Sequence, residues 1–89
     1  MMQNVVIPYN DQCDEQMYKF YLERMDWMTI TLKINLSFTK YCDLARSLII
    51  DHLITHNSYQ KYYTLNQIDH LAERFAQAYI KGQKQLYIY

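Results

Sequence analysis

The stretch MTITLKINLS, residues 28–37, alternates apolar and polar side chains without a break. Its apolar members are Met28, Ile30, Leu32, Ile34 and Leu36. Successive side chains of a β-strand point to opposite faces, so this stretch would have one apolar face and one polar face. On a helix the same side chains would be scattered around the axis. The alternation therefore predicts a strand with one solvated face.

Apolar residues at helical spacing lie on both sides of this stretch. Before it, a stripe that starts at Cys13 predicts a helix over about residues 11–26. After it, Ser37 or Thr39 is placed to cap a second helix that extends to about residue 57. This second helix carries apolar residues around much of its circumference, so we expect it to form the buried centre of the fold.

A third helix is predicted over about residues 65–81. Thr64 and Gln67 have the spacing of a capping box, which marks the start of a helix. Gly82 stands where a left-handed residue would end it. These signals are local, so they fix the ends of the third helix more firmly than those of the other two.

Two shorter β-prone segments lie near the ends of the chain. Val5-Val6-Ile7, followed by Pro8, fits an edge strand or an extended arm. Residues 83–89 fit a strand that would pair with 28–36. The predicted fold is a single α+β domain spanning 1–89, in which three amphipathic helices pack on a small antiparallel sheet of two or three strands, in the order (β)-α-β-α-α-β.

Charge and cysteine usage indicate an intracellular protein that is not strongly attracted to nucleic acid. Lysine plus arginine equals aspartate plus glutamate at nine each. This balance argues against non-specific binding to phosphate, which needs clustered cations. Cys13 and Cys42 make a poor disulfide framework, and the first residues lack a signal-peptide pattern. The longest apolar run is too short to span a bilayer. We therefore expect a cytoplasmic protein without a membrane partner.

The sequence offers little that could perform chemistry. His52 and His56 are four residues apart on the second predicted helix, and His70 would have to join them to bind a metal. The Glu of the H-E-x-x-H motif is missing. Cys13 and Cys42 fall on apolar stripes and are each followed by an aspartate, which would raise a thiol pKa. The prediction is therefore no catalytic residue, no metal and no cofactor.

Tyrosine is the compositional outlier, at ten residues in 89. It is enriched in binding surfaces because it supplies a large contact area and a hydroxyl at a small cost in entropy. The clustered tyrosines predicted to bind a partner are Tyr59, Tyr62, Tyr63, Tyr87 and Tyr89. The alternative is that these residues line the rim of a small core, or reflect an A·T-rich genome.

These features favour a non-catalytic protein-binding module, with a homodimer as a further expectation. Small single-domain chains without a catalytic motif are common in phages and other mobile elements. By that association, the chain is predicted to bind and block a host protein complex, for example a defence machine. The association rests on size and composition alone.

The second hypothesis is a small DNA-binding regulator. The predicted order of helices and strands resembles a winged helix, whose third helix enters the major groove. The residues of the helix at 65–81 that would face DNA are Asn66, Gln67, His70 and Arg74. Against this hypothesis, Asp69 and Glu73 lie on the same helix and would repel phosphate.

Overall fold

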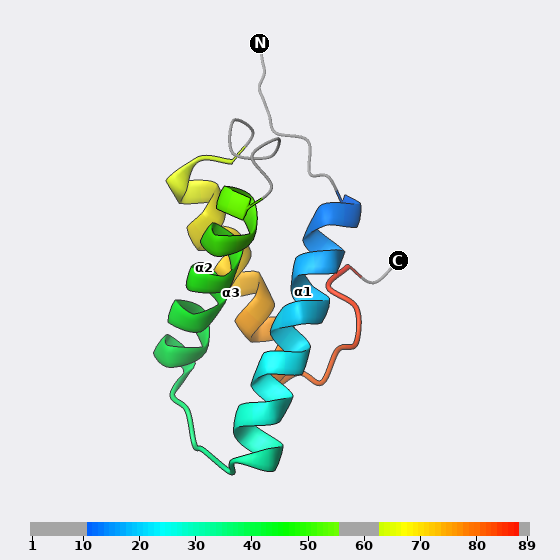
Figure 1. Cartoon of the computed structure of the whole chain (residues 1–89), viewed down its shortest axis with the longest axis vertical. Coiled ribbons are helices and arrows are strands. Elements are labelled where there is room, and N and C mark those ends of the chain that lie inside the picture. Colours follow the sequence, from blue (N-terminus) through cyan, green and yellow to red (C-terminus); the bar gives the residue numbers. More distant parts are fainter. Residues whose placement is uncertain (1–10, 56–62, 88–89) are drawn as a thin grey trace.

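The computed structural model describes residues 11–55 and 63–87, and this part of the chain is helical, with no strand and no sheet (Figure 1). The elements are α1 at Asp11–Asp26, a short π-helical turn η1 at Trp27–Thr31, α2 at Phe38–Thr55 and α3 at Leu65–Ile80. The three predicted helices are present. The predicted α+β fold with a small antiparallel sheet is wrong, because neither 28–36 nor 83–87 forms a strand.

The alternating stretch begins as a continuation of α1. The Thr29 hydroxyl donates to the Met25 carbonyl at 2.8 Å, a side-chain bond that competes with the helical ladder and widens the turn. The Tyr79 hydroxyl, from α3, lies 2.9 Å from the Thr29 hydroxyl and donates to Asp26 at 2.9 Å. These contacts hold the end of α1 in a helical turn where the side-chain pattern alone predicts an extended chain.

The chain then reverses instead of extending. Lys33 adopts φ 57°, in the left-handed region, and the Ile34 N–H donates to the Met28 carbonyl at 2.9 Å. A strand needs a neighbour for its backbone groups, and no described segment lies in position to supply one. Of the alternating apolar side chains, Met28 and Leu36 are partly buried, whereas Ile30, Leu32 and Ile34 are exposed.

The local signals at α3 are confirmed. The Gln67 N–H donates to the Thr64 hydroxyl at 3.2 Å, and the Gln67 side chain accepts from the Thr64 N–H at 2.7 Å, which completes the capping box. Gly82, at φ 79°, donates to the Tyr79 carbonyl, and the Gln83 N–H donates to the Ala78 carbonyl. These two bonds form a Schellman motif. The chain beyond it, residues 83–87, runs along α1 without regular structure.

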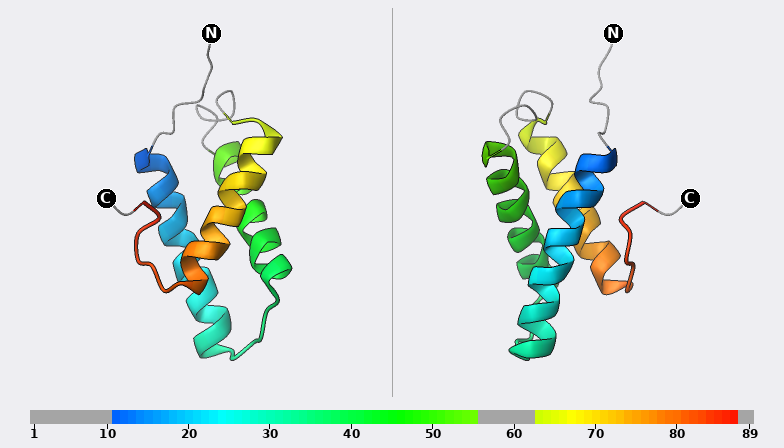
Figure 2. Two further views of the ribbon diagram at one scale, coloured as in Figure 1. Left: turned by 180° about the vertical axis from the view of Figure 1, so that it is seen from behind. Right: turned by 45° about the vertical axis from the view of Figure 1, so that its right-hand side comes forward.

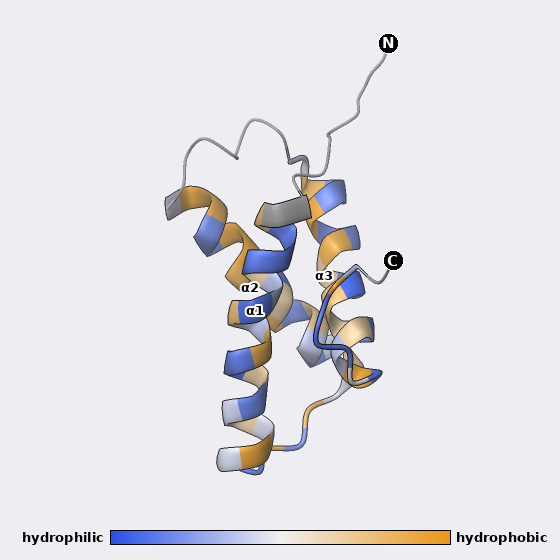
Figure 3. Cartoon of the chain, turned by 90° about the vertical axis from the view of Figure 1, so that its right-hand side faces the viewer, coloured by the Kyte–Doolittle hydropathy of each residue, from blue (hydrophilic) through white to orange (hydrophobic). Residues whose placement is uncertain are grey.

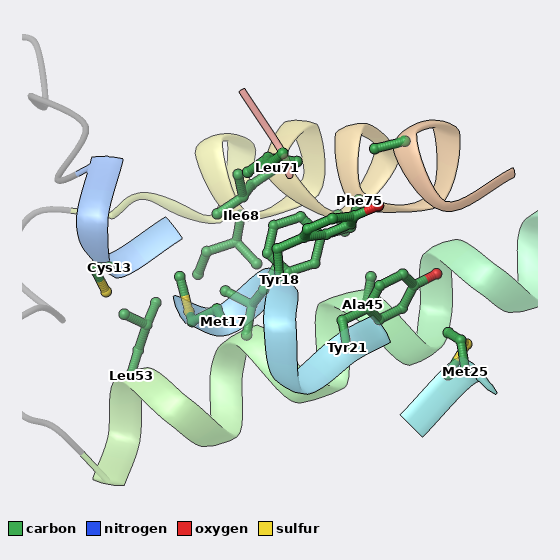
Figure 4. Close-up of a cluster of buried hydrophobic side chains, with 14 residues drawn as sticks. Cys13, Met17, Tyr18, Tyr21, Met25, Ala45, Leu53, Ile68, Leu71 and Phe75 are labelled. Atoms are coloured by element: carbon green, nitrogen blue, oxygen red, sulfur yellow. The ribbon is translucent and has the colours of Figure 1, made fainter. Parts of the chain in front are cut away.

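The core lies between α1 and α3 and is closed by α2 (Figure 4). Tyr18 and Tyr21 of α1 are fully buried, and their rings lie 5.3 and 5.4 Å from the ring of Phe75 on α3. Helix α2 contributes only three buried residues, Ala45, Ile49 and Leu53. The expectation that this helix is the buried centre is therefore wrong.

Helix α3 lies behind α1 and α2 in Figure 1 and in front of them when the molecule is seen from the back (Figure 2). One side of the α1–α2 pair is therefore covered by α3, and the opposite side faces the viewer of Figure 1. No helix in the described part of the chain combines the length and hydropathy that crossing a membrane requires. The predicted segment at 5–7 lies outside the residues that the structure describes.

Candidate partner-binding groove

A groove of about 600 Å³ lies between α1 and α2, and none of its lining residues comes from α3. Its apolar surface is formed by Phe20 and Trp27 on one wall and by Leu44 and Leu48 on the other. Ser47 and Thr55 add small polar groups from α2. Mostly apolar concave surfaces with a few polar groups are typical of binding sites.

The two aromatic side chains of the groove are unusually open to solvent. Phe20 is 46 % exposed and Trp27 is 53 % exposed. They are seven residues apart, Phe20 on α1 and Trp27 at the start of η1, which continues α1, so they lie on one side of this continuous helix, next to the stripe that enters the core. The Phe20 ring lies 6.0 Å from the imidazole of His52 across the groove. An exposed aromatic pair in a concave site is a typical anchor point for a protein partner.

Charged groups of both signs border this apolar surface. Glu23 and Arg24 line the groove from α1, and Asp51 and His52 line it from α2. Glu23, Arg24 and Asp51 are exposed. Charges at the rim of an interface contribute more to the choice and orientation of a partner than to affinity.

The structure places two of the five predicted partner-binding tyrosines at a buried carboxylate. The Tyr63 hydroxyl donates to one oxygen of Asp14 at 2.7 Å, and the Tyr87 hydroxyl donates to the other at 2.8 Å. Asp14 has no exposed surface. Tyr63 and Tyr87 are half-buried, so they serve the interior of this chain. Tyr59, Tyr62 and Tyr89 lie outside the described residues.

The neighbouring carboxylate anchors the C-terminal segment. The two oxygens of Glu15 accept from the backbone N–H groups of Leu86 and Tyr87, each at 2.8 Å. The Arg74 guanidinium lies 5.3 Å from the centre of the Tyr87 ring, on the same segment. Both carboxylates lie in the first turns of α1, where the helix dipole favours negative charge. Asp14 and Glu15 thus tie Leu86 and Tyr87 to α1.

The thiols are poorly placed for nucleophilic chemistry. Burial raises the pKa of the Cys13 thiol; a hydrogen bond with Tyr63 partly offsets this effect, and the Asp14 charge adds to it. Burial also raises the pKa of Cys42, with further increases from Glu73 and Asp43. Because the thiolate is the reactive form, these shifts disfavour the nucleophilic state of both side chains.

Two of the three histidines that were weighed as metal ligands lie on different helices. His52 lies on α2 at the groove and His70 lies exposed on α3, while His56 is outside the described residues. Within residues 11–55 and 63–87, no group of three or more histidine, cysteine, aspartate or glutamate side chains could hold a metal ion.

Two of the four residues predicted to face DNA are engaged within the protein. Gln67 is half-buried in the capping box, and Arg74 stacks on Tyr87. Asn66 and His70 are exposed on α3. Asp69, on the same helix, lies 3.4 Å from the Arg46 guanidinium of α2.

The spacing of Phe20 and Trp27 in the sequence is a signal for the groove. Phe20 falls in the apolar stripe of α1, but Tyr18 takes its place in the core. The i, i+7 pair of Phe20 and Trp27 marks a second apolar face on that helix. Leu44 and Leu48, four residues apart on α2, likewise share one face of their helix, but only the tertiary packing sets that face against Phe20 and Trp27.

Comparisons of this chain with protein families, with curated proteins and with solved structures found no match.

Proposed function

We propose that this chain is a small non-catalytic protein-binding module and that its partner docks in the groove between α1 and α2. The observation that carries the proposal is the exposed pair Phe20 and Trp27 above an apolar surface in a groove of about 600 Å³. Phe20 and Trp27 are about half exposed, so the isolated chain lacks the stability that their full burial would add. A partner that covers them recovers this free energy.

The shape of the groove favours an amphipathic helix as the bound element. Its walls are two neighbouring helices, and α3 occupies their other side (Figure 2). A helix laid between α1 and α2 would complete a four-helix arrangement, in which an apolar stripe packs into the seam. Glu23 and Asp51 would pair with basic residues on the flanks of such a helix, and Arg24 with an acidic one.

The state of the cysteines supports a binding role over thiol catalysis, because burial raises the pKa of both thiols. The inhibition of a host protein complex, expected from size and composition, stays a prediction. In that case the groove would take a helix of the complex. Tyr63 and Tyr87 do not support a tyrosine-rich binding surface, since their hydroxyls donate to Asp14 within the protein.

The test is an affinity capture that compares a groove variant with a matched control. Ser47→Arg places a long cation in the groove, and Gln77→Arg places the same side chain on the exposed side of α3. Both positions are exposed, so both variants are expected to fold, which circular dichroism would verify. We expect a stoichiometric protein that survives nuclease treatment to bind the wild type and Gln77→Arg, and to be lost from Ser47→Arg.

Two results would contradict the proposal. Retention of the same partner by Ser47→Arg would move the binding surface away from the groove. Recovery that disappears with nuclease would favour the DNA-binding hypothesis, and Asn66 and His70 on α3 would become the residues to substitute.

A further inference from the structure

A second pocket, of about 370 Å³, lies where the end of α1, the start of α2 and the end of α3 meet. It shares no lining residue with the groove between α1 and α2. In Figure 3 the chain turns from the lower end of α3 into the C-terminal segment, whose first residues line this pocket. Its volume suits a small ligand. The lining residues are Leu22, Asp26, Tyr41, Tyr79, Ile80, Gly82, Gln83 and Lys84.

One carboxylate oxygen in this pocket is left for solvent or a ligand. Asp26 is half-buried, and its Oδ1 accepts from the Tyr79 hydroxyl at 2.9 Å. No hydrogen bond or ion pair from residues 11–55 or 63–87 reaches its Oδ2. A carboxylate that is partly removed from water and has an unused oxygen favours a cation that can also donate a hydrogen bond.

Two tyrosine rings line the pocket together with this carboxylate. The ring centres of Tyr41 and Tyr79 are 5.7 Å apart, and the ring planes are inclined by 43°. Tyr41 is half-buried, and its hydroxyl makes no hydrogen bond within the described part of the chain. Aromatic rings beside a carboxylate attract an organic ammonium ion, because the face of each ring carries partial negative charge. Leu22 and Ile80 add apolar surface for the uncharged part of such a ligand.

The walls of the pocket are held in place without a ligand. The hydroxyl of the fully buried Tyr18 donates to the Gln83 carbonyl at 2.7 Å. The hydroxyl of Tyr21, also fully buried, donates to the Tyr41 carbonyl at 3.0 Å. The Schellman bonds of Gly82 and Gln83 fix the turn that leaves α3. A ligand would therefore lose little affinity to the ordering of its site.

Lys84 is the one cation among residues 11–55 and 63–87 that lines the pocket. It is exposed and forms no ion pair with Asp26. Lys81 is also exposed and does not line the pocket, and Arg24 lines the groove instead. Solvent and salt screen an exposed ammonium group on a flexible stem more than they screen a half-buried carboxylate. The charge of Asp26 therefore dominates inside the pocket.

We propose that this pocket binds a small organic ammonium ion with an apolar arm. The ammonium group donates to Oδ2 of Asp26 and lies against the rings of Tyr41 and Tyr79. The apolar arm packs on Leu22. Lys84 weakens the binding of such a ligand through like-charge repulsion. The pocket is separate from the groove, so this proposal does not rest on the proposed function.

The test is an NMR titration of the full chain, in which the amide chemical shifts are followed as phenethylammonium is added. We expect saturable shifts at Asp26, Tyr41 and Gln83, with a Kd on the order of 1 mM, as is typical of so small a ligand. Phenylpropionate has a similar shape and the opposite charge, and it is expected to give no saturable shift.

Four variants test the roles of the charges and of the ring. Asp26→Asn keeps an oxygen for the Tyr79 hydroxyl but removes the charge, and it is expected to raise the Kd about tenfold or more. Glu23→Gln removes an exposed carboxylate of the same helix outside the pocket and should leave the Kd unchanged. Tyr41→Leu is expected to raise the Kd about threefold. Lys84→Gln is expected to lower it about twofold.

The absence of saturable shifts up to about 20 mM phenethylammonium would overturn the proposal, as would equal binding of phenethylammonium and phenylpropionate. An unchanged Kd in a folded Asp26→Asn would also overturn it. Ser47→Arg, the groove variant, is expected to bind the ammonium ion like the wild type. A chain that binds the ammonium ion but captures no protein contradicts only the proposed function. A chain that captures a protein through the groove but binds no ammonium ion contradicts only the present proposal.

Discussion

Asp14 is the residue on which the interior depends most, because a fully buried carboxylate must have its oxygens satisfied. It accepts from two tyrosines that lie 49 and 73 positions further along the chain. An asparagine at this position keeps the shape but offers an N–H₂ group to a hydroxyl that needs an acceptor. We expect Asp14→Asn to lower the free energy of unfolding by about 2 kcal/mol.

Chemical denaturation would measure this loss, and Tyr87→Phe would complete a double-mutant cycle. The two substitutions are expected to be non-additive, because each removes the same hydrogen bond. If Asp14→Asn had the same free energy of unfolding as the wild type, the hydrogen bonds to Asp14 would not stabilise the fold.

Within residues 11–55 and 63–87, two residues occupy the left-handed region, and one of them is a glycine. Lys33 has φ 57° and Gly82 has φ 79°. The conformation costs a residue with a β-carbon about 1 kcal/mol. We expect Lys33→Gly to stabilise the protein and Gly82→Ala to destabilise it, each by about 1 kcal/mol.

A β-carbon at Gly82 would meet no atom within 4 Å, so backbone conformation alone should decide its effect. Thermal unfolding would measure whether Lys33→Gly raises and Gly82→Ala lowers the stability of the protein. A destabilised Lys33→Gly would mean that the lysine side chain contributes more than its backbone conformation costs.

At the scale of elements, the helices and the boundaries of α3 could be predicted from the sequence because their causes are local. Thr64, Gln67 and Gly82 act on neighbours within five positions. The turn η1 could not be predicted, because it is held by Tyr79, 50 positions away from Thr29. Perfect alternation in residues 28–37 describes which side chains are apolar, but a strand also requires a backbone partner, and none of the described segments supplies one.

The C-terminal segment is the second element whose place rests on a distant contact. Glu15 holds the N–H groups of Leu86 and Tyr87 with its two oxygens. Glu15→Gln replaces one acceptor with an N–H₂ group that faces a donor. We expect residues 83–87 to detach while the three helices persist, at a cost of about 1–2 kcal/mol in stability.

Amide hydrogen exchange would show the change as faster exchange at Leu86 and Tyr87. Glu23→Gln removes an exposed carboxylate from the same helix and is the matched control, with no expected effect on these two amides. Unaltered protection of the segment in Glu15→Gln would mean that packing of the buried Leu86 suffices to hold it.

The aromatic core makes the stability of the whole molecule sensitive to alkaline pH. Burial raises the pKa of Tyr18 to about 12, and it also raises the pKa of Tyr21, from an ordinary value of 10.0. A raised pKa means that the folded state retains a proton which the unfolded chain loses first. The stability that these hydroxyls contribute is therefore complete below pH 10 and is lost as the pH rises toward 12.

The expected loss is about 1.4 kcal/mol per pH unit for each tyrosine, or about 3 kcal/mol per unit for the two together. Denaturant unfolding between about pH 10 and pH 12 would measure this slope. Tyr18→Phe should reduce the measured slope by about 1.4 kcal/mol per pH unit and leave the rest, because burial also raises the pKa of Tyr63 and Tyr79. An equal slope in wild type and variant would show that Tyr18 has the same pKa in the folded and the unfolded state.

The proposed binding surface was harder to predict than the helices. The composition indicated a tyrosine-rich binding surface. In the structure the hydroxyls of Tyr63 and Tyr87 donate to Asp14, and nothing in the sequence around Asp14 indicates these distant partners. The groove arises where α1 and α2 diverge on the side away from α3. Each wall leaves a trace in the sequence, Phe20 and Trp27 at seven positions apart and Leu44 and Leu48 at four, but nothing in the sequence pairs the two walls.

The groove between α1 and α2 is the surface that we propose binds a partner. The most direct measurement is amide hydrogen exchange of this chain with and without the protein captured in the pull-down. We predict slower exchange in residues 20–27 and 44–55, and unchanged exchange in the exposed turns of α3. Protection confined to α3 around Asn66 and His70, with none in the walls of the groove, would contradict the account.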